Sequence, residues 1–175
     1  MKAVVFTQPG LPIQDAQSLF ETELPQPIPR ARDLLIEVKA IAVNPVDTKV
    51  RARSTSKQPQ VLGWDTVGIV REVGGDVSLF RPGDEVFYAG AIDRPGSYSE
   101  FHLVDERIVG HKPRTLDNAS AAALPLTSIT AWELLFDRLG IKEGGGKGQS
   151  LLVIGAGGGV GSILVQLARK LTQLT

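Results

Sequence analysis

The stretch LLVIGAGGGVGSILVQLARK, residues 151–170, decides the fold class of the chain. With Ser150 it begins as the apolar run SLLVIGA, which is typical of a strand covered on both faces in a parallel sheet. After the glycines, Leu164, Leu167, Ala168 and Leu171 recur at helical spacing, so an amphipathic helix is predicted. A buried strand, a glycine turn and a helix in this order predict an α/β nucleotide-binding unit.

The glycine turn predicts a site for a pyrophosphate. Residues without a Cβ let the main chain approach the anion, and the helix that follows offers unpaired N–H groups and a positive dipole end. Ala156, Gly158 and Gly161 occupy the three glycine positions of the dinucleotide fingerprint, with alanine as a departure at the first. Gly159 and Val160 complete the predicted cofactor-binding segment. A purely structural glycine turn in another α/β sheet is the alternative.

The residue that distinguishes NAD from NADP is expected about 20 residues after the glycines, which is past Thr175. A nucleoside-triphosphatase phosphate loop is excluded, because no lysine followed by Ser or Thr comes after the glycines. A single strand–helix unit also cannot form a parallel pair by itself. The chain is therefore interpreted as a fragment of a larger protein, or as one whose last unit docks elsewhere.

The preceding sequence is rich in short strands. Alternating apolar residues and Gly or Pro turns predict a small all-β barrel or sandwich up to about residue 112. Strands are predicted over residues 1–6, 33–44, 65–74 and 97–105. Residues 81–90 are predicted to form a turn at Pro82-Gly83 followed by a strand that contains Val86 to Tyr88.

Two helices are predicted before the glycine turn. One covers residues 117–125, capped by Asp117 or Asn118 and ended by Pro125. The other covers residues 127–140, with Trp132, Leu135, Phe136 and Leu139 on its apolar face, a capping box of Thr130 and Glu133, and a stop at Gly140.

Composition excludes several classes of function. Lys and Arg total 19, and so do Asp and Glu, which gives no basic excess for nucleic acid or an anionic membrane. No signal peptide and no run of about 18 apolar residues is evident, so a cytoplasmic protein without a membrane span is expected. There is no cysteine, and the two histidines, His102 and His111, are too few for a zinc site of the usual kind.

Five ordered segments carry a resemblance to a known family. They are VNPVDTKVR (43–51), LGWDTVGIVREVG (62–74), RPGDEVF (81–87), LPLTSITAWELLF (124–136) and VIGAGGGVGSILVQLA (153–168). Together they resemble the quinone oxidoreductase branch of the medium-chain dehydrogenase/reductase superfamily, often labelled zinc-type alcohol dehydrogenase-like. The resemblance implies a mixed β and α/β fold. Residues 1–116 would be a GroES-like β-barrel domain, 117–149 a helical bridge and linker, and 150–175 the first βα unit of a Rossmann domain, with the active site in the cleft between the domains.

Departures from the zinc-dependent relatives are informative. Where those enzymes have a cysteine ligand, this chain has Asn44-Pro45, and Gly63-Trp64-Asp65 stands in place of their Gly-His-Glu. No metal is therefore expected. The resemblance implies hydride transfer from NADPH, with NADH possible, to a quinone or an activated alkene or carbonyl. The full-length form would be a homodimer, and the 175-residue form weakly active or inactive.

The resemblance also implies roles for individual residues. Asn44 and Asp47 are the expected catalytic residues. Asn44, Thr48 and Thr130 would contact the cofactor, and Trp64 and Tyr88 would form the substrate wall. Most have a structural alternative. Asn44-Pro45 could be an ordinary turn opening, Asp47 could cap or pair on a short helix, and Thr130 could be only a helix cap. Trp64 could lie in the core or at a domain contact, and Tyr88 could be a half-buried residue at the end of a strand.

Two other functions stay open. A non-catalytic GroES-like module would self-associate or bind a partner, because an open sheet edge and an apolar helix face favour association. A zinc alcohol dehydrogenase is the third hypothesis, and it would require stoichiometric zinc.

Overall fold

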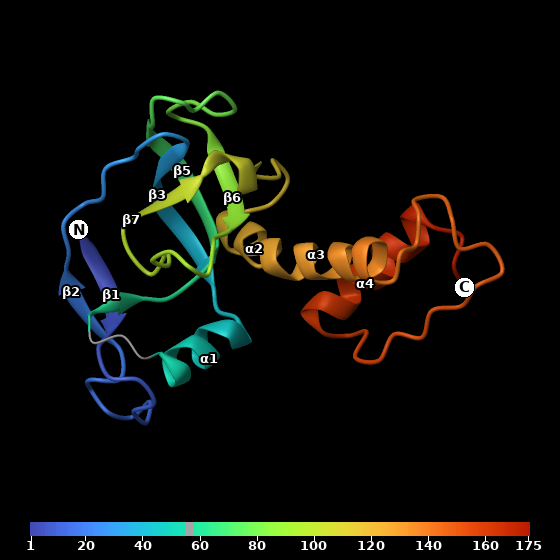
Figure 1. Ribbon diagram of the computed structural model, residues 1–175, viewed down its shortest axis with the longest axis horizontal. Coiled ribbons are helices and arrows are strands. Elements are labelled where there is room, and N and C mark those ends of the chain that lie inside the picture. Colours follow the sequence, from blue (N-terminus) through green and yellow to red (C-terminus); the bar gives the residue numbers. More distant parts are fainter. Residues whose placement is uncertain (55–57) are drawn as a thin grey trace. The chain divides into compact units, whose positions relative to one another are not determined.

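The computed structural model describes residues 1–54 and 58–175, and the chain packs as two units, Met1–Ala123 and Leu124–Thr175 (Figure 1). The first unit contains β1 (Lys2–Phe6), β2 (Phe20–Glu23), β3 (Asp33–Ala42), α1 (Pro45–Arg53), β4 (Gln60–Val61), β5 (Asp65–Val73), β6 (Glu85–Ala89), β7 (Phe101–Asp105), the 3-10 turn η1 (Glu106–Ile108), β8 (Gly110–His111) and α2 (Asn118–Ala122). The second contains α3 (Pro125–Trp132), the π-helical turn η2 (Glu133–Arg138) and α4 (Gly159–Leu171).

The first unit is β-rich, as predicted. Its strands form two antiparallel sheets, in the orders β2-β1-β4 and β7-β3-β5-β6-β8. The sheets are connected just before β7, where Tyr98 accepts a main-chain hydrogen bond from Val4 and Glu100 accepts one from Val38. All five predicted strands are present, although the last begins at Phe101 instead of residue 97.

Two of the three apolar cores described in the first unit bear on the candidate site. One face of the five-stranded sheet buries Leu34, Ile36, Val70, Val86, Tyr88 and Val104. The second core joins Phe6, Leu62 and Trp64 to the side chains of Val46 and Val50 on α1. Because α1 packs on this second core, the residues at its N-terminus are held in a fixed position, and this end of α1 carries the predicted catalytic pair.

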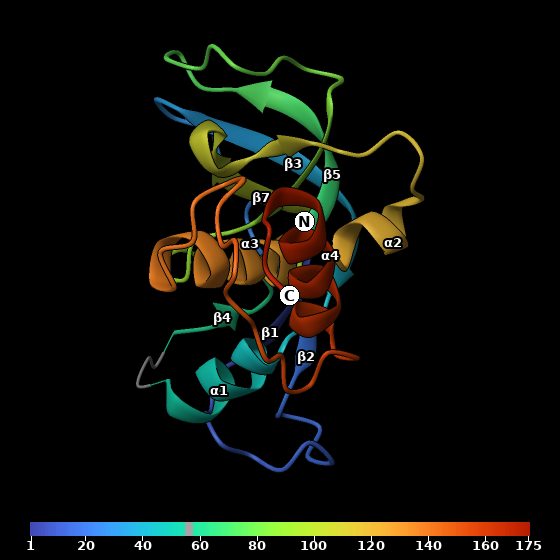
Figure 2. The same cartoon turned by 90° about the vertical axis from the view of Figure 1, so that its right-hand side faces the viewer.

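In the second unit α3 packs against α4 (Figure 2). Ala131 and Leu135 pack against Leu164 and Ala168, so the predicted apolar stripe of α4 is confirmed. On the preceding helix the prediction is partly wrong, since Trp132 and Leu139 are exposed. The π-helical turn over Glu133–Arg138 shifts the register of the apolar residues, which helical spacing of 3.6 residues does not anticipate.

The predicted strand at 150–156 is wrong. Residues 151–153 have no regular structure, and a turn follows at 154–157. A strand in a parallel sheet needs a neighbouring strand, and none is present for this segment among the residues described. Leu152 and Ile154 are consequently 85% and 90% exposed.

Helix boundaries need two further corrections. Asp117 caps α2 as predicted, accepting the amide of Ser120. Pro125 does not end that helix but occupies the first turn of α3, where its missing N–H removes no hydrogen bond. Thr130 lies inside α3, so the predicted capping box with Glu133 is wrong. The stop at Gly140 is confirmed by its positive φ of 65°.

Within the described part of the chain, one helical stretch, Asn118–Arg138, is long and apolar enough to cross a membrane on length and composition alone. A core helix of a soluble protein passes the same test. Ala131 and Leu135 of this stretch pack against α4, so part of its apolar surface is already used within the second unit.

Candidate functional site

Asn44 caps the N-terminus of α1 and connects two buried carboxylates. Its main-chain N–H donates to Oδ2 of Asp47 at 2.6 Å, and its side-chain Nδ2 donates to Oδ2 of Asp65 at 2.8 Å. Asn44 and Asp47 form a reciprocal capping box, and Pro45 follows at the first helical position. The predicted catalytic pair, Asn44 and Asp47, is therefore brought together, and Asp65 joins it from the start of β5.

Burial distinguishes this cluster from an ordinary helix cap. The exposed fraction of Asp47 is 3% and that of Asp65 is 0%, whereas Asn44 is only half-buried. Two carboxylates kept from water beside one amide are costly unless hydrogen bonds satisfy them. Asn44 donates one hydrogen bond to each carboxylate. Because Asn44 is only half-buried, it is the member of this cluster that a ligand could contact.

Tyr98 extends the cluster, and neither the sequence motifs nor the resemblance pointed to it. Its hydroxyl and Oδ1 of Asp47 are both buried without a hydrogen-bond partner among the described residues. Burial raises the pKa of Tyr98 above its usual value, and the negative charges of Asp47 and Asp65 raise it further. The hydroxyl is therefore protonated at neutral pH and lies beside a carboxylate.

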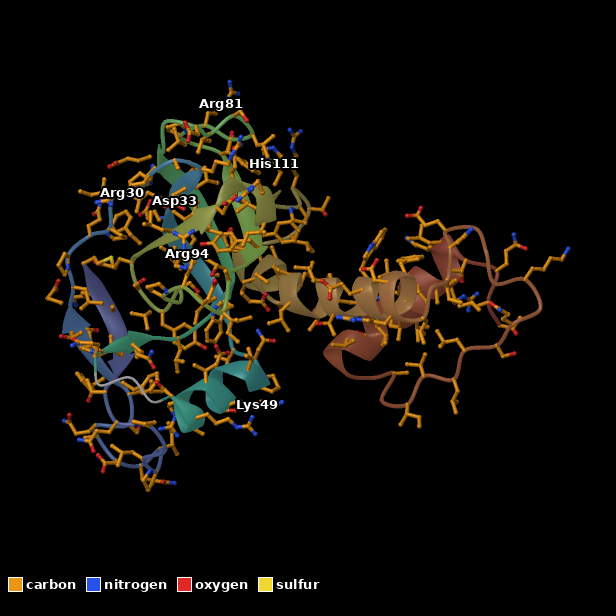
Figure 3. The ribbon with its side chains drawn as sticks, viewed as in Figure 1. Arg30, Asp33, Lys49, Arg81, Arg94 and His111 are labelled. Carbon is orange, nitrogen blue, oxygen red and sulfur yellow. The ribbon has the colours of Figure 1, made fainter. Side chains whose placement is uncertain are left out.

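Thr48 lies on the exposed side of α1. Its hydroxyl donates to the carbonyl of Pro45 at 2.9 Å, which is a local helix contact. Lys49, the next residue, extends from α1 away from the strands of its unit (Figure 3). Thr48 is thus accessible to a ligand, and its predicted cofactor contact stays a prediction.

Trp64 borders a cavity of about 410 Å³ in the first unit. Val50 from α1, Leu62 and Ile92 also line this cavity. The indole is 4% exposed and its Nε1 donates to the carbonyl of Ala91 at 3.0 Å, so the ring is fixed as one wall. The geometry accommodates both sequence hypotheses, a core residue and a substrate wall.

Tyr88 lies in the core of the five-stranded sheet, at 2% exposure. Its hydroxyl and Nδ1 of His102 are 2.8 Å apart, and the two rings stack. Contact between Tyr88 and a substrate would require this core to open. Its place in the substrate wall stays a prediction, and Tyr88 is more deeply buried than the half-buried strand end that was the alternative.

The glycine turn leads directly into α4 in the second unit. Gly158 is the N-cap, no side chain caps the helix, and Gly155 to Gly159 are exposed. The first amides of a helix have no partner within it, so those of Gly159, Val160 and Gly161 are directed at whatever binds in front. Val160 itself is half-buried in the core with Leu164, which leaves its main chain as the group available to a ligand.

The first turn of α4 packs closely against the glycine turn, and this explains why position 161 must be glycine. A Cβ on Gly161 would lie 2.3 Å from the carbonyl oxygen of Gly155 and 2.8 Å from Cα of Ala156. The positive φ, 77°, falls at Gly155, one residue before the predicted first fingerprint position. Ala156 has no such conformation, and this is why alanine is tolerated there.

On α3, Thr127 contacts the turn, because a Cβ on Gly159 would lie 2.9 Å from its Cγ2. The family motif at 124–136 contains both Thr127 and Thr130, and nothing in its spacing distinguishes the two threonines. The Thr130 hydroxyl is exposed and donates to the carbonyl of Leu126 at 2.7 Å. Its predicted contact with cofactor phosphate stays a prediction.

The turn fits the pyrophosphate of a dinucleotide. The space beside Gly155 and Gly157 is open, because a Cβ built at either would meet no heavy atom within 4 Å. The uncapped amides supply donors and the helix supplies a positive end.

A zinc ion does not fit the residues described. Among residues 1–54 and 58–175, no group of three His, Cys, Asp or Glu side chains could hold a metal ion. Both ring nitrogens of His102 are engaged, by Tyr88 and by the carbonyl of Pro95. At the position of the family's cysteine ligand, the amide of Asn44 is held by Asp65.

Comparison with known proteins defines the class. Residues 30–114 match the alcohol dehydrogenase GroES-like domain. The chain belongs to the medium-chain dehydrogenase/reductase superfamily.

The nearer relatives are oxidoreductases of this superfamily. A zinc-type alcohol dehydrogenase-like protein of Staphylococcus epidermidis is 43% identical over 97% of the chain and 51% of the relative. The 2-methylene-furan-3-one reductase of Solanum lycopersicum is 40% identical over 85% of the chain and 40% of that enzyme. The chain therefore spans about half the length of the curated relatives it matches.

Solved structures agree with the fold. A Rhizobium etli protein with the provisional name of a zinc-dependent alcohol dehydrogenase is 58% identical, with a TM-score of 0.92 over 100% of the chain and 51% of that protein. The quinone oxidoreductase of Coxiella burnetii is 31% identical, with a TM-score of 0.81 over 98% of the chain and 54% of the enzyme.

Proposed function

We propose that the chain is part of an NADPH-dependent reductase that transfers a hydride to a quinone or an activated alkene or carbonyl without a metal. The observation that carries the proposal is the uncapped N-terminus of α4, which follows an exposed turn where a Cβ at Gly155 or Gly157 would meet no heavy atom within 4 Å. An exposed glycine turn of this kind lets an anion approach the unpaired amides and the positive end of the helix.

In this proposal, different residues of the chain bind the two ends of the cofactor. The amides of Gly159, Val160 and Gly161 bind the pyrophosphate, and Asn44 orients the nicotinamide end. When bound, the reduced nicotinamide supplies the hydride. Quinones and enones are electron-poor already, so orientation provides most of the catalysis and a Lewis acid is dispensable. The names of the Coxiella and Solanum relatives support this class of acceptor for the whole protein.

Titration of NADPH into the 175-residue chain by calorimetry tests the proposal. Binding with one site per chain is expected, weaker than in a protein of full family length. NADH in a parallel titration measures the preference between the two cofactors. No heat with either would refute a cofactor site in this chain.

A charge placed in the turn gives a sharper test. Gly158 has an extended φ of −80° and ψ of 172°, and a Cβ there would meet only the Gly155 carbonyl, at 3.4 Å. Gly158→Asp should therefore keep or strengthen the helix as an N-cap, yet repel the pyrophosphate and weaken NADPH binding about tenfold or more. Gln166→Glu adds the same charge on the exposed side of α4 and should leave the affinity unchanged.

One observation favours the non-catalytic alternative. Leu152 and Ile154 are almost fully exposed beside each other, which is unusual for apolar side chains. A partner or a second copy could cover them. Light scattering showing a concentration-dependent dimer that Leu152→Lys disrupts would support this alternative, and a monomer at high concentration would count against it.

A further inference from the structure

We infer that Asp65 is a positioning residue, which fixes the amide of Asn44 in one orientation and so determines which hydrogen-bonding group this side chain presents to a ligand. The inference rests on the proposed function, in which Asn44 meets the nicotinamide end of the cofactor. Asp65 itself, with no exposed surface, cannot touch a ligand.

The orientation follows from the chemistry of the partners. A carboxylate only accepts hydrogen bonds, so the group facing Oδ2 of Asp65 at 2.8 Å must be the NH2 end of the Asn44 amide. On the other side, the capping box places the Asn44 side chain beside the main chain of Asp47, whose N–H donates to the main-chain carbonyl of Asn44 at 3.0 Å. The oxygen end of the amide is compatible with that side, and the contact with Asp65 is the one that selects the orientation.

One group of the amide then remains available. The oxygen faces the first turn of α1, and one N–H faces Asp65, so the second N–H of Nδ2 is left to donate. A donor at this position suits a carbonyl oxygen, such as that of the nicotinamide carboxamide. Without Asp65 the amide could rotate and present its oxygen, which would repel the same carbonyl.

The location of Asp65 supports a dedicated role. It is the first residue of β5, paired with Ala42 of β3 and Ala89 of β6, so its backbone is fixed on both sides. Burying a carboxylate in this place is unfavourable for stability unless its hydrogen bonds compensate. An asparagine at 65 would avoid that charge while still offering an oxygen to Asn44.

Two substitutions at position 65 separate the hydrogen bond to Asn44 from the buried charge. Asp65→Asn keeps an acceptor for Asn44, whereas Asp65→Ala removes it. In the chain without cofactor, the side-chain amide protons of Asn44 can be followed by 1H–15N NMR and assigned by their loss in Asn44→Ala. Slow exchange and a shifted Nδ2 proton are expected in the parent and in Asp65→Asn, and both features should disappear in Asp65→Ala. An unchanged Asn44 amide in Asp65→Ala would overturn the inference, whatever NADPH does.

The functional half is tested by a double-mutant cycle on the Kd of NADPH, using Asp65→Ala, Asn44→Ala and the pair. If Asp65 acts through Asn44, Asp65→Ala should weaken binding about fivefold in the parent and not at all in the Asn44→Ala background. Asp65→Asn should restore most of the affinity. Equal effects of Asp65→Ala in both backgrounds would show a general effect on folding and overturn the role. If no variant and no parent binds NADPH, the proposed function fails, while the NMR result still decides the orientation of Asn44.

Discussion

His102 should make the first unit sensitive to acid. The ring is 4% exposed, and burial lowers its pKa from 6.5 to about 4. Nε2 lies 3.0 Å from the carbonyl oxygen of Pro95, which can only accept, so Nε2 carries the proton of the neutral ring. Nδ1 then accepts from the Tyr88 hydroxyl at 2.8 Å. A second proton would have to go on Nδ1, which could then no longer accept the hydrogen bond that the Tyr88 hydroxyl donates.

The sign of the effect follows from the direction of the shift. Because the folded pKa lies below the unfolded one, the unfolded chain binds more protons between about pH 4 and 6.5. The contribution of His102 to the free energy of unfolding is therefore fully present above pH 6.5 and is lost as the pH falls toward 4. A shift from 6.5 to about 4, at 1.36 kcal/mol per unit, corresponds to about 3 kcal/mol in total. About 2 kcal/mol of it is lost by pH 5.

Urea unfolding at pH 7.5 and pH 5 measures the loss. Because Trp132 lies in the second unit, Trp132→Phe leaves Trp64 as the only tryptophan and restricts the fluorescence signal to the first unit. In the Trp132→Phe background, the urea midpoint should fall between pH 7.5 and pH 5. The fall should be about 1 M larger with His102 present than in the His102→Gln variant, for an m-value of about 2 kcal/mol/M. His102→Gln removes the titrating ring, and His111→Gln is the control because His111 is exposed.

Two results would refute the reasoning. One is an NMR titration that gives His102 an ordinary pKa near 6.5. The other is a pH dependence in His102→Gln equal to that of the parent, which would assign the acid sensitivity to carboxyl groups instead.

Three further predictions concern packing and capping. Leu164→Ala removes a buried side chain between α4 and α3 and should lower the free energy of unfolding of the second unit by about 2–5 kcal/mol, measured by urea denaturation followed by circular dichroism. Gly63→Ala should cost about 3 kcal/mol, because its φ is 96° and a Cβ would lie 2.2 Å from the ring of Tyr98. Gly75→Ala, where a Cβ meets nothing within 4 Å, is the matched control and should change stability by less than about 0.5 kcal/mol. Asp117→Ala should cost about 1 kcal/mol through loss of the α2 cap, and a thermal melt unchanged at pH 7 would contradict the assigned cap.

The strands of the first unit could be predicted because they are determined locally. Alternation along residues 33–44 and the turn at Pro82-Gly83 each specify their own segment. Buried charge could not be predicted in this way. Glu106 is fully buried because Arg32 and the amides of Ser78 and Leu79 converge on it from distant parts of the chain, and no short window contains that information.

The residues of the candidate site also differ in whether a local pattern or the tertiary structure identifies them. Asn44, Asp47 and the glycines stand in contiguous motifs, so a sequence pattern is enough to propose them as candidates. In the sequence Asp65 stands out only as part of the stretch Gly63-Trp64-Asp65 that replaces Gly-His-Glu, and its hydrogen bond to Asn44 depends on how β5 is placed beside the end of β3. Tyr98 reaches Asp47 from a different segment, and no motif joins the two residues.

The segment from Leu151 to Ile154 shows where local pattern and tertiary structure diverge. Its side chains alternate as in a strand: Leu151 and Val153 pack on the core with α4, while Leu152 and Ile154 face water. One face of the segment is therefore buried within the second unit, and the other face is exposed to water. Apolar residues on both faces are what a strand inside a parallel sheet requires, so the sequence is suited to a neighbour that the described residues do not provide. A peptide or chain segment that pairs here should bury Leu152 and Ile154 together and protect the amides of this segment from hydrogen exchange. Protection gained without burial of both side chains would contradict this interpretation.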